Sequence, residues 1–297
     1  MKLMVIDSQG AGNLATLQKL LPDVRVRGID HPDHRGYTYH PHGHWCGWLA
    51  GVPLQAHALK IGQPGAHELV FLQIFDKDSK ALSDSFMFEQ IAAEQPDYLS
   101  RSWGAWDQDD PFIRTGIDGF YREHWVPSFA KLQDGLGFVD FGAAGNNDAN
   151  DSDSDVAYPQ AAMPERCNII GARARNGRPA KWSGDGRGVL HTMWAAGVAS
   201  PNPDGSWTRW SGTSAATPKA AGVCAALEMD ADTYRGLVAD TASRPEGYKL
   251  PHPKWGWGDM EYLWQSFAAD LPRNLLPPAK TGTLRITHHD FNRIRRK

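Results

Sequence analysis

The stretch TRWSGTSAATPKAAGV, residues 208–223, places Ser214 between a glycine turn and a run of small residues. A serine hydroxyl is a poor nucleophile at neutral pH, so it needs a base and a third group that orients the base. The small residues predict a thin helix that begins near Ser214, where free N–H groups and the helix dipole favour an oxyanion. Pro218 is expected in the first turn, where its missing N–H does no harm. The stretch therefore predicts nucleophilic chemistry that depends on partners elsewhere in the chain.

Candidate partners lie upstream of Ser214, each beside a predicted element. Asp7 ends the apolar run LMVID and is followed by Ser-Gln-Gly. His42 opens HGHWCGWLAG, a segment of small and aromatic residues that predicts a tightly packed helix. Asn146 lies in GAAGNN, directly after the predicted strand at 137–143. A carboxylate, an imidazole and an amide donor are the groups that serine chemistry requires.

These segments together resemble the subtilisin-like serine proteases over about residues 1–268. The serine motif SGTSAATPKAAG is close to that of the family, and Asp7, His42 and Ser214 follow the family's chain order. The resemblance implies a peptidase that works through an acyl-enzyme, with His42 as base, Asp7 as its orienting group and Asn146 as oxyanion donor. The segment SRSWGAW is similar to the one that pairs with substrate. The substrate-binding residues expected on this basis are Ser102, Trp103, Gly104, Ala144, Gly145 and Trp210.

The histidine segment departs from the family pattern, because His44 and Trp45 replace the usual threonine and second histidine. His40 and His44 therefore compete with His42 for the role of base, and Gly43 after His42 favours His42. On a strand, the alternation of His40, His42, His44 and Cys46 would share one face and suggest zinc, but a second ligand cluster is missing. The departure also leaves open a non-catalytic peptide-binding module, or an esterase or transpeptidase that uses the same acyl-enzyme.

An acidic segment, DANDSDSD, follows the oxyanion asparagine at residues 148–155. Its carboxylates suit Ca²⁺, which the resemblance implies as a structural ion, although no cofactor is required for the chemistry. The same carboxylates would favour a basic residue before the scissile bond, and a solvated acidic loop is the alternative. The residues concerned are Asp148, Asp151, Asp153 and Asp155.

The elements that position these groups alternate between strands and helices. Buried strands are expected at 2–7, 24–30, 67–75, 97–101, 137–143 and 167–174, and helices at 12–21, 42–52, 83–94, 116–135, 214–228 and 258–270. Alternation of this kind favours an α/β fold of three α/β/α layers around a mainly parallel sheet. Polar residues at the carboxyl ends of the strands, such as Asp7, Ser102 and Asn146, would meet at one edge.

Length and composition fit a single large domain at residues 1–268, with a proline-rich, peripheral or partly ordered tail at 269–297. The net charge of −3 gives no global attraction to nucleic acid or to an anionic membrane. The N-terminal apolar run is too short for a secretion signal, and three cysteines do not form a disulfide framework. We therefore expect a cytoplasmic protein that acts on protein or peptide substrates and is restrained by narrow specificity, a closed cleft or a partner inhibitor.

Overall fold

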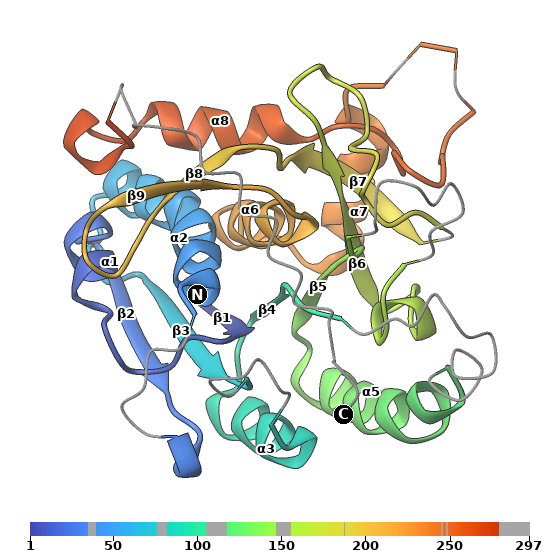
Figure 1. The fold of residues 1–297 in the computed structure, drawn as a ribbon, viewed down its shortest axis with the longest axis horizontal. Coiled ribbons are helices and arrows are strands. Elements are labelled where there is room, and N and C mark those ends of the chain that lie inside the picture. Colours follow the sequence, from blue (N-terminus) through green and yellow to red (C-terminus); the bar gives the residue numbers. More distant parts are fainter. Residues whose placement is uncertain are drawn as a thin grey trace, which may run out of the picture.

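The computed structural model describes residues 1–34, 40–75, 82–104, 118–146, 156–186, 188–244, 246–247 and 249–278. Seven strands form one sheet in the order β2-β3-β1-β4-β5-β6-β7, and every neighbouring pair is parallel (Figure 1). The strands are β1 (Lys2–Asp7), β2 (Val24–Ile29), β3 (His67–Gln73), β4 (Tyr98–Arg101), β5 (Val139–Ala143), β6 (Cys167–Arg173) and β7 (Val189–Trp194). A separate antiparallel pair contains β8 (Val198–Pro201) and β9 (Trp207–Trp210). The predicted parallel α/β fold is confirmed.

Helices cover both faces of the sheet and give three layers (Figure 1). In β1, Leu3 and Val5 face one hydrophobic core while Met4 and Ile6 face the other, as the two-residue period of a strand requires. The first core packs against α1 (Ala15–Leu20), α2 (His42–Ile61), α6 (Thr213–Ala226), α7 (Ala231–Thr241) and α8 (Glu261–Ala269). The second packs against α3 (Asp84–Glu94), the π-helix η2 (Tyr121–Trp125) and α5 (Val126–Leu136). Short 3₁₀ turns are η1 (Pro32–His34), η3 (Gln160–Ala162) and η4 (Arg273–Leu275).

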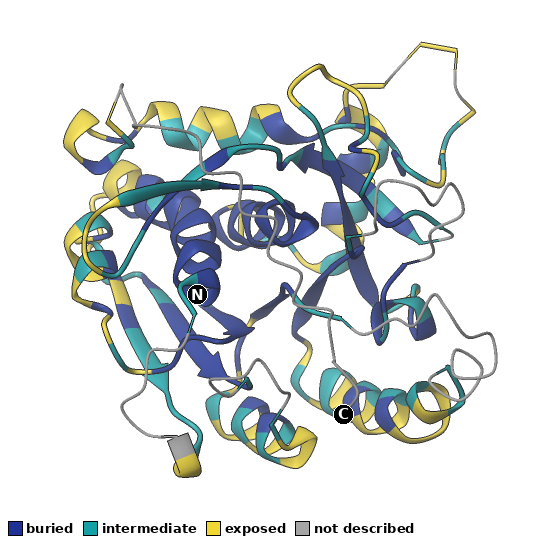
Figure 2. Ribbon diagram, in the orientation of Figure 1, coloured by how far each residue is buried: buried dark blue, intermediate teal, exposed yellow. Residues whose placement is uncertain are grey.

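The two helices that carry the candidate residues His42 and Ser214, α2 and α6, are the most deeply buried (Figure 2). Every residue of α6 is buried, which its alanine and glycine content permits. A β-carbon at Gly222 would lie 2.3 Å from the carbonyl oxygen of Ala50, so only glycine allows α6 to approach α2 this closely. The small residues after Ser214 therefore allow α6 to pack closely against α2.

A buried ion pair joins α6 to the closing helix α8. The Lys219 Nζ donates to Glu261 Oε1 at 2.8 Å and to the Trp194 carbonyl at 2.9 Å, and both charged side chains are almost completely buried. The second carboxylate oxygen of Glu261 accepts the backbone N–H of Trp194 at 3.0 Å. The pair thus links α6, the helix that contains Ser214, to the end of β7.

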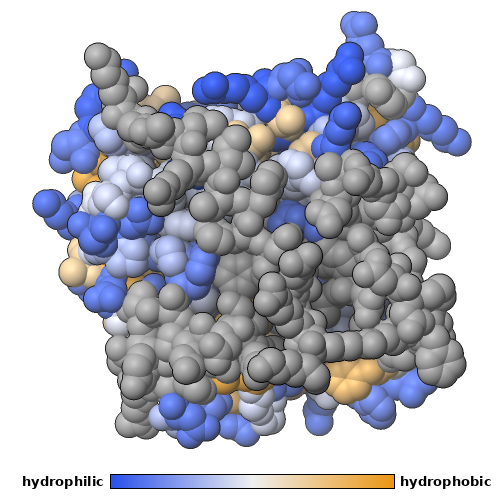
Figure 3. All heavy atoms as spheres, in the orientation of Figure 1, coloured by the Kyte–Doolittle hydropathy of each residue, from blue (hydrophilic) through white to orange (hydrophobic). Residues whose placement is uncertain are grey.

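Several elements differ from the prediction. The strand pair β8–β9, strand β7 and helix α7 were not predicted, and Pro218 lies in the second turn of α6 rather than the first. In the predicted tail, Leu271 and Leu275 are buried, while residues 279–297 lie outside the described residues. The described surface on the face in Figure 3 is mainly hydrophilic, with small, separate apolar areas. Among the described residues, no helix combines the length and apolarity needed to cross a membrane.

Candidate active site

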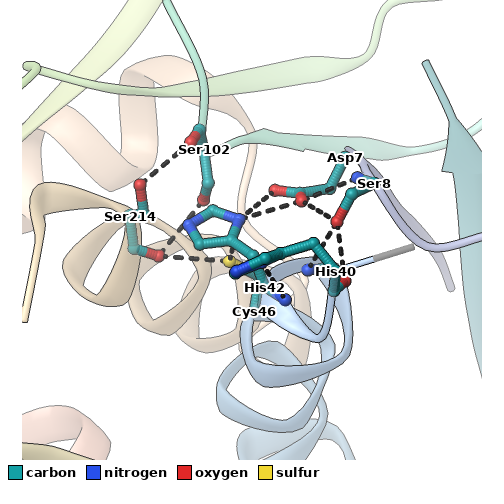
Figure 4. A network of polar contacts seen from close by, with 8 residues as sticks. Asp7, Ser8, His40, His42, Cys46, Ser102 and Ser214 are labelled. Atoms are coloured by element: carbon teal, nitrogen blue, oxygen red, sulfur yellow. Dashed lines mark hydrogen bonds and ion pairs between the residues drawn. The ribbon is translucent and has the colours of Figure 1, made fainter. Parts of the chain in front are cut away.

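The carboxyl ends of three adjacent strands supply polar groups to one edge of the sheet. Asp7 is the last residue of β1, Ser102 follows β4, and Asn146 comes three residues after β5. Because β1, β4 and β5 are consecutive in the parallel sheet, their carboxyl ends lie side by side. The same edge receives the first residues of α2 and α6, and thus brings His42 and Ser214 to these strand ends (Figure 4).

The Asp7 carboxylate holds the imidazole of His42. His42 Nδ1 lies 2.9 Å from one carboxylate oxygen and 3.0 Å from the other. Asp7 Oδ1 also accepts the backbone N–H of Ser8 at 2.7 Å and the Ser8 hydroxyl at 3.0 Å. Both acidic and imidazole groups are buried, at 1% and 4% exposure, so the contact is shielded from water. A carboxylate on Nδ1 favours the tautomer with its proton on Nδ1 and leaves Nε2 as an acceptor.

The pKa of His42 follows from this placement. Burial lowers the pKa, but the negative charge of Asp7, with a smaller contribution from Cys46, raises it well above the ordinary value of 6.5. The indole of Trp210 lies against the imidazole, with ring centres 5.3 Å apart and planes inclined by 68°. The ring of His42 is thereby fixed between Asp7 and Ser214 (Figure 4).

The Ser214 carbonyl is freed from the helix by Pro218. In an α-helix the carbonyl of residue 214 would accept the N–H of residue 218, but proline has none. Ser102 Oγ donates to this carbonyl at 3.2 Å and Cys46 Sγ at 3.4 Å. In return, the Ser214 hydroxyl donates to the Ser102 carbonyl at 2.9 Å. Pro218 therefore creates the acceptor through which the neighbouring elements hold Ser214.

Thr213 fixes the orientation of the Asn146 amide. Asn146 Oδ1 accepts the Thr213 backbone N–H at 2.8 Å and the Thr213 hydroxyl at 3.1 Å. The Thr213 hydroxyl oxygen in turn accepts the backbone N–H of Gly145 at 3.1 Å. With Oδ1 occupied twice, the Nδ2 donor faces Gly212, where an added β-carbon would lie 3.3 Å from it and 3.7 Å from the Ser214 nitrogen. The Asn146 amide nitrogen and the Ser214 backbone nitrogen thus lie close to the same point beside Gly212.

Hydrogen bonds from the Gln160 side chain support the predicted substrate-binding segment Ser102–Gly104. Gln160 Nε2 donates to the Trp103 carbonyl at 2.7 Å and to the Ala143 carbonyl at 3.1 Å. At Gly104 an added β-carbon would lie 2.6 Å from the Ala157 β-carbon, so the two segments touch. Of the other predicted substrate-binding residues, Ala144, Gly145 and Trp210 are buried at the same sheet edge. The predicted calcium ligands Asp148, Asp151, Asp153 and Asp155 lie outside the described residues.

The competing histidines occupy other places. His40 Nδ1 accepts the backbone N–H of His42 at 3.2 Å. His44 is completely buried, and neither ring nitrogen hydrogen-bonds to a described residue. The zinc interpretation based on alternate residues sharing a strand face is wrong, because α2 begins at His42 and only His42 and Cys46 are one turn apart.

The sequence reasoning missed three residues of this site: Ser8, Gln160 and Thr213. Cys46 was considered as a possible zinc ligand, and its contact with the Ser214 carbonyl was not predicted. The Asp-Ser pair at 7–8 and the threonine beside Ser214 were visible signals. Gln160 carries no local signal, because it reaches the site only through the folded chain.

A parallel α/β sheet whose carboxyl edge brings together a carboxylate, an imidazole and a serine at a helix start is the arrangement found in one class of serine hydrolases. The family model described as "Subtilase family" matches residues 37–258. The chain therefore belongs to the subtilase family and is a serine protease.

Curated relatives match part of the chain. A protein named "Calcium-dependent protease" from Trichormus variabilis (strain ATCC 29413 / PCC 7937) is 28% identical over 197 residues, which cover 55% of this chain and 28% of that protein. The protein of the same name from Nostoc sp. (strain PCC 7120 / SAG 25.82 / UTEX 2576) is 27% identical over 191 residues, with the same coverage. The match thus spans little more than a quarter of each relative's length.

Solved structures share the fold over most of the chain. A lanthipeptide protease has a TM-score of 0.65 at 15% identity and covers 90% of this chain and 88% of its own. The prenylagaramide maturation protease PagA has 0.61 at 17%, covering 92% and 94%. The self-cleaved protease domain of PatA has 0.61 at 20%, covering 91% and 96%. At these identities the likeness establishes the subtilisin-like fold.

Proposed function

We propose that the protein is a serine endopeptidase with Asp7, His42 and Ser214 as its catalytic triad. The observation that carries the proposal is the buried Asp7–His42 contact on the side of the imidazole that faces away from Ser214. His42 Nε2 takes the proton of Ser214 as the hydroxyl attacks the peptide carbonyl, and then gives it to the leaving amine. Water hydrolyses the acyl-enzyme by the reverse route. The Ser214 hydroxyl turns from the Ser102 carbonyl toward His42 for this step.

Labelling with a serine-directed fluorophosphonate tests the proposal. Wild-type protein should be labelled, and Ser214→Ala should not, while Ser211→Ala serves as a matched control three residues away. A folded wild-type protein that resists labelling would support the non-catalytic binding module instead. Parallel assays with ester and peptide substrates, and with added amine nucleophiles, separate a peptidase from an esterase or transpeptidase.

Asn146 and the backbone N–H of Ser214 are proposed to stabilise the oxyanion. Asn146→Leu should lower kcat about 10²- to 10³-fold with little change in KM, because the donor acts on charge that develops in the transition state. Steady-state kinetics measure both constants. Asn176→Leu, in an exposed turn, is the control and should leave both constants unchanged. A loss confined to KM would mean that Asn146 only binds substrate.

The substrate backbone is proposed to lie along Ser102–Gly104 as an added strand. Gln160 occupies the Trp103 carbonyl, and the Ser102 carbonyl is released when the Ser214 hydroxyl turns toward His42, so the backbone groups of Ser102 and Gly104 are the ones proposed to pair with substrate. The acidic segment at 148–155 supports a preference for a basic residue before the scissile bond. Peptides that differ only in Arg, Leu or Phe at that position should be cleaved fastest after Arg; equal or faster cleavage after Leu would contradict this preference.

The pH dependence should reflect the raised pKa of His42. The base must be neutral, so kcat/KM should fall as pH decreases through a value above 6.5, with a limiting slope of one. The measurement is kcat/KM against pH in buffers of constant ionic strength. If kcat/KM falls only below pH 6.5, the negative charge of Asp7 does not raise the pKa of His42.

Calcium is proposed as a structural ion, supported by the acidic segment and by the name of the curated relatives. Thermal unfolding tests this proposal, because a structural ion should give a higher unfolding temperature with Ca²⁺ than with EGTA. A narrower role in peptide maturation, which the name of the structural neighbour PagA suggests, is tested by including precursor peptides in the substrate panel.

A further inference from the structure

The thiol of Cys46 lies beside the Asp7 carboxylate and the His42 imidazole. It lies one helical turn after His42 in α2, and its Sγ is 3.8 Å from His42 Nδ1. The donor atoms of Asp7, His42 and Cys46 all lie within 4.8 Å of one another, and all three residues are buried. Figure 4 shows the sulfur and the carboxylate on the same side of the imidazole.

This donor set fits a tetrahedral cation of the zinc type. Zinc bonds of about 2.0–2.3 Å to carboxylate, imidazole and thiolate put the ligand atoms about 3.3–3.6 Å apart. The separations of 2.9–3.0 Å between Nδ1 and the Asp7 oxygens, and of 3.8 Å between Nδ1 and Sγ, need shifts of only a few tenths of an ångström. The Asp7 carboxylate and the Cys46 sulfur, which lie within 4.8 Å of each other, must approach by up to about 1 Å, which a rotation of the Cys46 side chain can supply. A carboxylate, an imidazole and a thiolate carry two negative charges, which offset the charge of the ion in this buried place.

We propose that Asp7, His42 and Cys46 form an inhibitory site for zinc-type divalent cations. The inhibitory part rests on the proposed function of His42. A cation on Nδ1 displaces the proton that Asp7 holds there, and that proton moves to Nε2. The thiol of Cys46 loses its own proton to solvent when the sulfur binds. An imidazole with its proton on Nε2 cannot accept the proton of Ser214, so catalysis stops while the fold is kept.

The binding part is tested without any catalytic assay. Co²⁺ is added to the Ser214→Ala protein in a buffer without chelators or thiols. A thiolate-to-cobalt charge-transfer absorption in the near ultraviolet should appear and should be lost when Zn²⁺ displaces Co²⁺. The band should be absent in Cys46→Ala and strongly reduced in Cys46→Ser, whose hydroxyl is a poorer ligand. Cys224→Ala, which removes another buried thiol of the first core, should keep the band. A missing band, or one unchanged in the Cys46 variants, overturns the site.

The inhibitory part is tested on the protein with Ser214 intact. Zn²⁺ should inhibit peptide cleavage, a zinc-selective chelator should restore it, and Cys46→Ala should need at least about tenfold more Zn²⁺ for half-inhibition relative to its own metal-free activity. Binding without inhibition overturns the inhibitory role and leaves the site. Cobalt binding in a protein that cleaves no peptide overturns the proposed function and leaves the site.

Discussion

Replacing Asp7 by asparagine should lower kcat about 10⁴-fold while the fold stays intact. Asp7 accepts from His42 Nδ1 and from the Ser8 backbone N–H and hydroxyl, so the carboxylate works as an acceptor for all of its neighbours. An asparagine that keeps the Ser8 contacts through its oxygen turns its NH₂ group toward Nδ1. The imidazole then carries its proton on Nε2 and cannot accept the proton of Ser214.

Single-turnover and steady-state kinetics on Asp7→Asn measure this loss, and thermal unfolding checks that the protein is folded. Asp134→Asn is the matched control, because Asp134 is exposed on α5 and pairs with Arg166 away from the sheet edge. Activity within tenfold of wild type would show that Asp7 does not set the tautomer of His42, and the triad assignment would fail.

The parts of the site that depend on local sequence were predictable. Asp7 and Asn146 each follow an apolar run, and a buried strand brings the polar residue at its end to the functional edge. The helix at Ser214 was predictable because its run of alanines has a high helix propensity and its small side chains allow close packing. The position of Pro218 was predicted wrongly: it is the sixth residue of α6, which begins at Thr213, and therefore lies in the second turn.

The parts that depend on tertiary contacts were not predictable. Strand β7 contains His191 and Thr192, and its burial rests on partners such as Tyr234, whose hydroxyl lies 2.9 Å from His191 Nε2. The segment after α6 is rich in charged residues, so α7 is recognisable only by its Asp230 cap and a few apolar side chains. Cys46 reaches His42 from one turn further along α2. Gln160 reaches the Trp103 carbonyl from the 3₁₀ segment η3, which is distant in the sequence.

Stability should fall steeply between pH 6.5 and 4 because three histidines are buried in neutral form. Burial lowers the pKa of His44, His67 and His191 from 6.5 to about 4 in each case. A lowered pKa of a base means that the unfolded chain binds more protons in this window, so the free energy of unfolding decreases as pH falls. Each histidine then costs roughly 3 kcal/mol by pH 4, and the three together about 9 kcal/mol. Asp259 and Glu261, whose pKa burial raises, bind protons in the folded state and offset part of this loss.

Urea unfolding of the Ser214→Ala protein at a series of pH values measures the effect without self-digestion. His44→Leu is the sharpest variant, because neither ring nitrogen of His44 hydrogen-bonds to a described residue and leucine keeps the packing. It should reduce the slope of unfolding free energy against pH by about 1.4 kcal/mol per pH unit, the value for one proton. His124→Leu, at an exposed position, should leave the slope unchanged. A slope in His44→Leu equal to that of the parent would mean that folding does not lower the pKa of His44, and the prediction would fail.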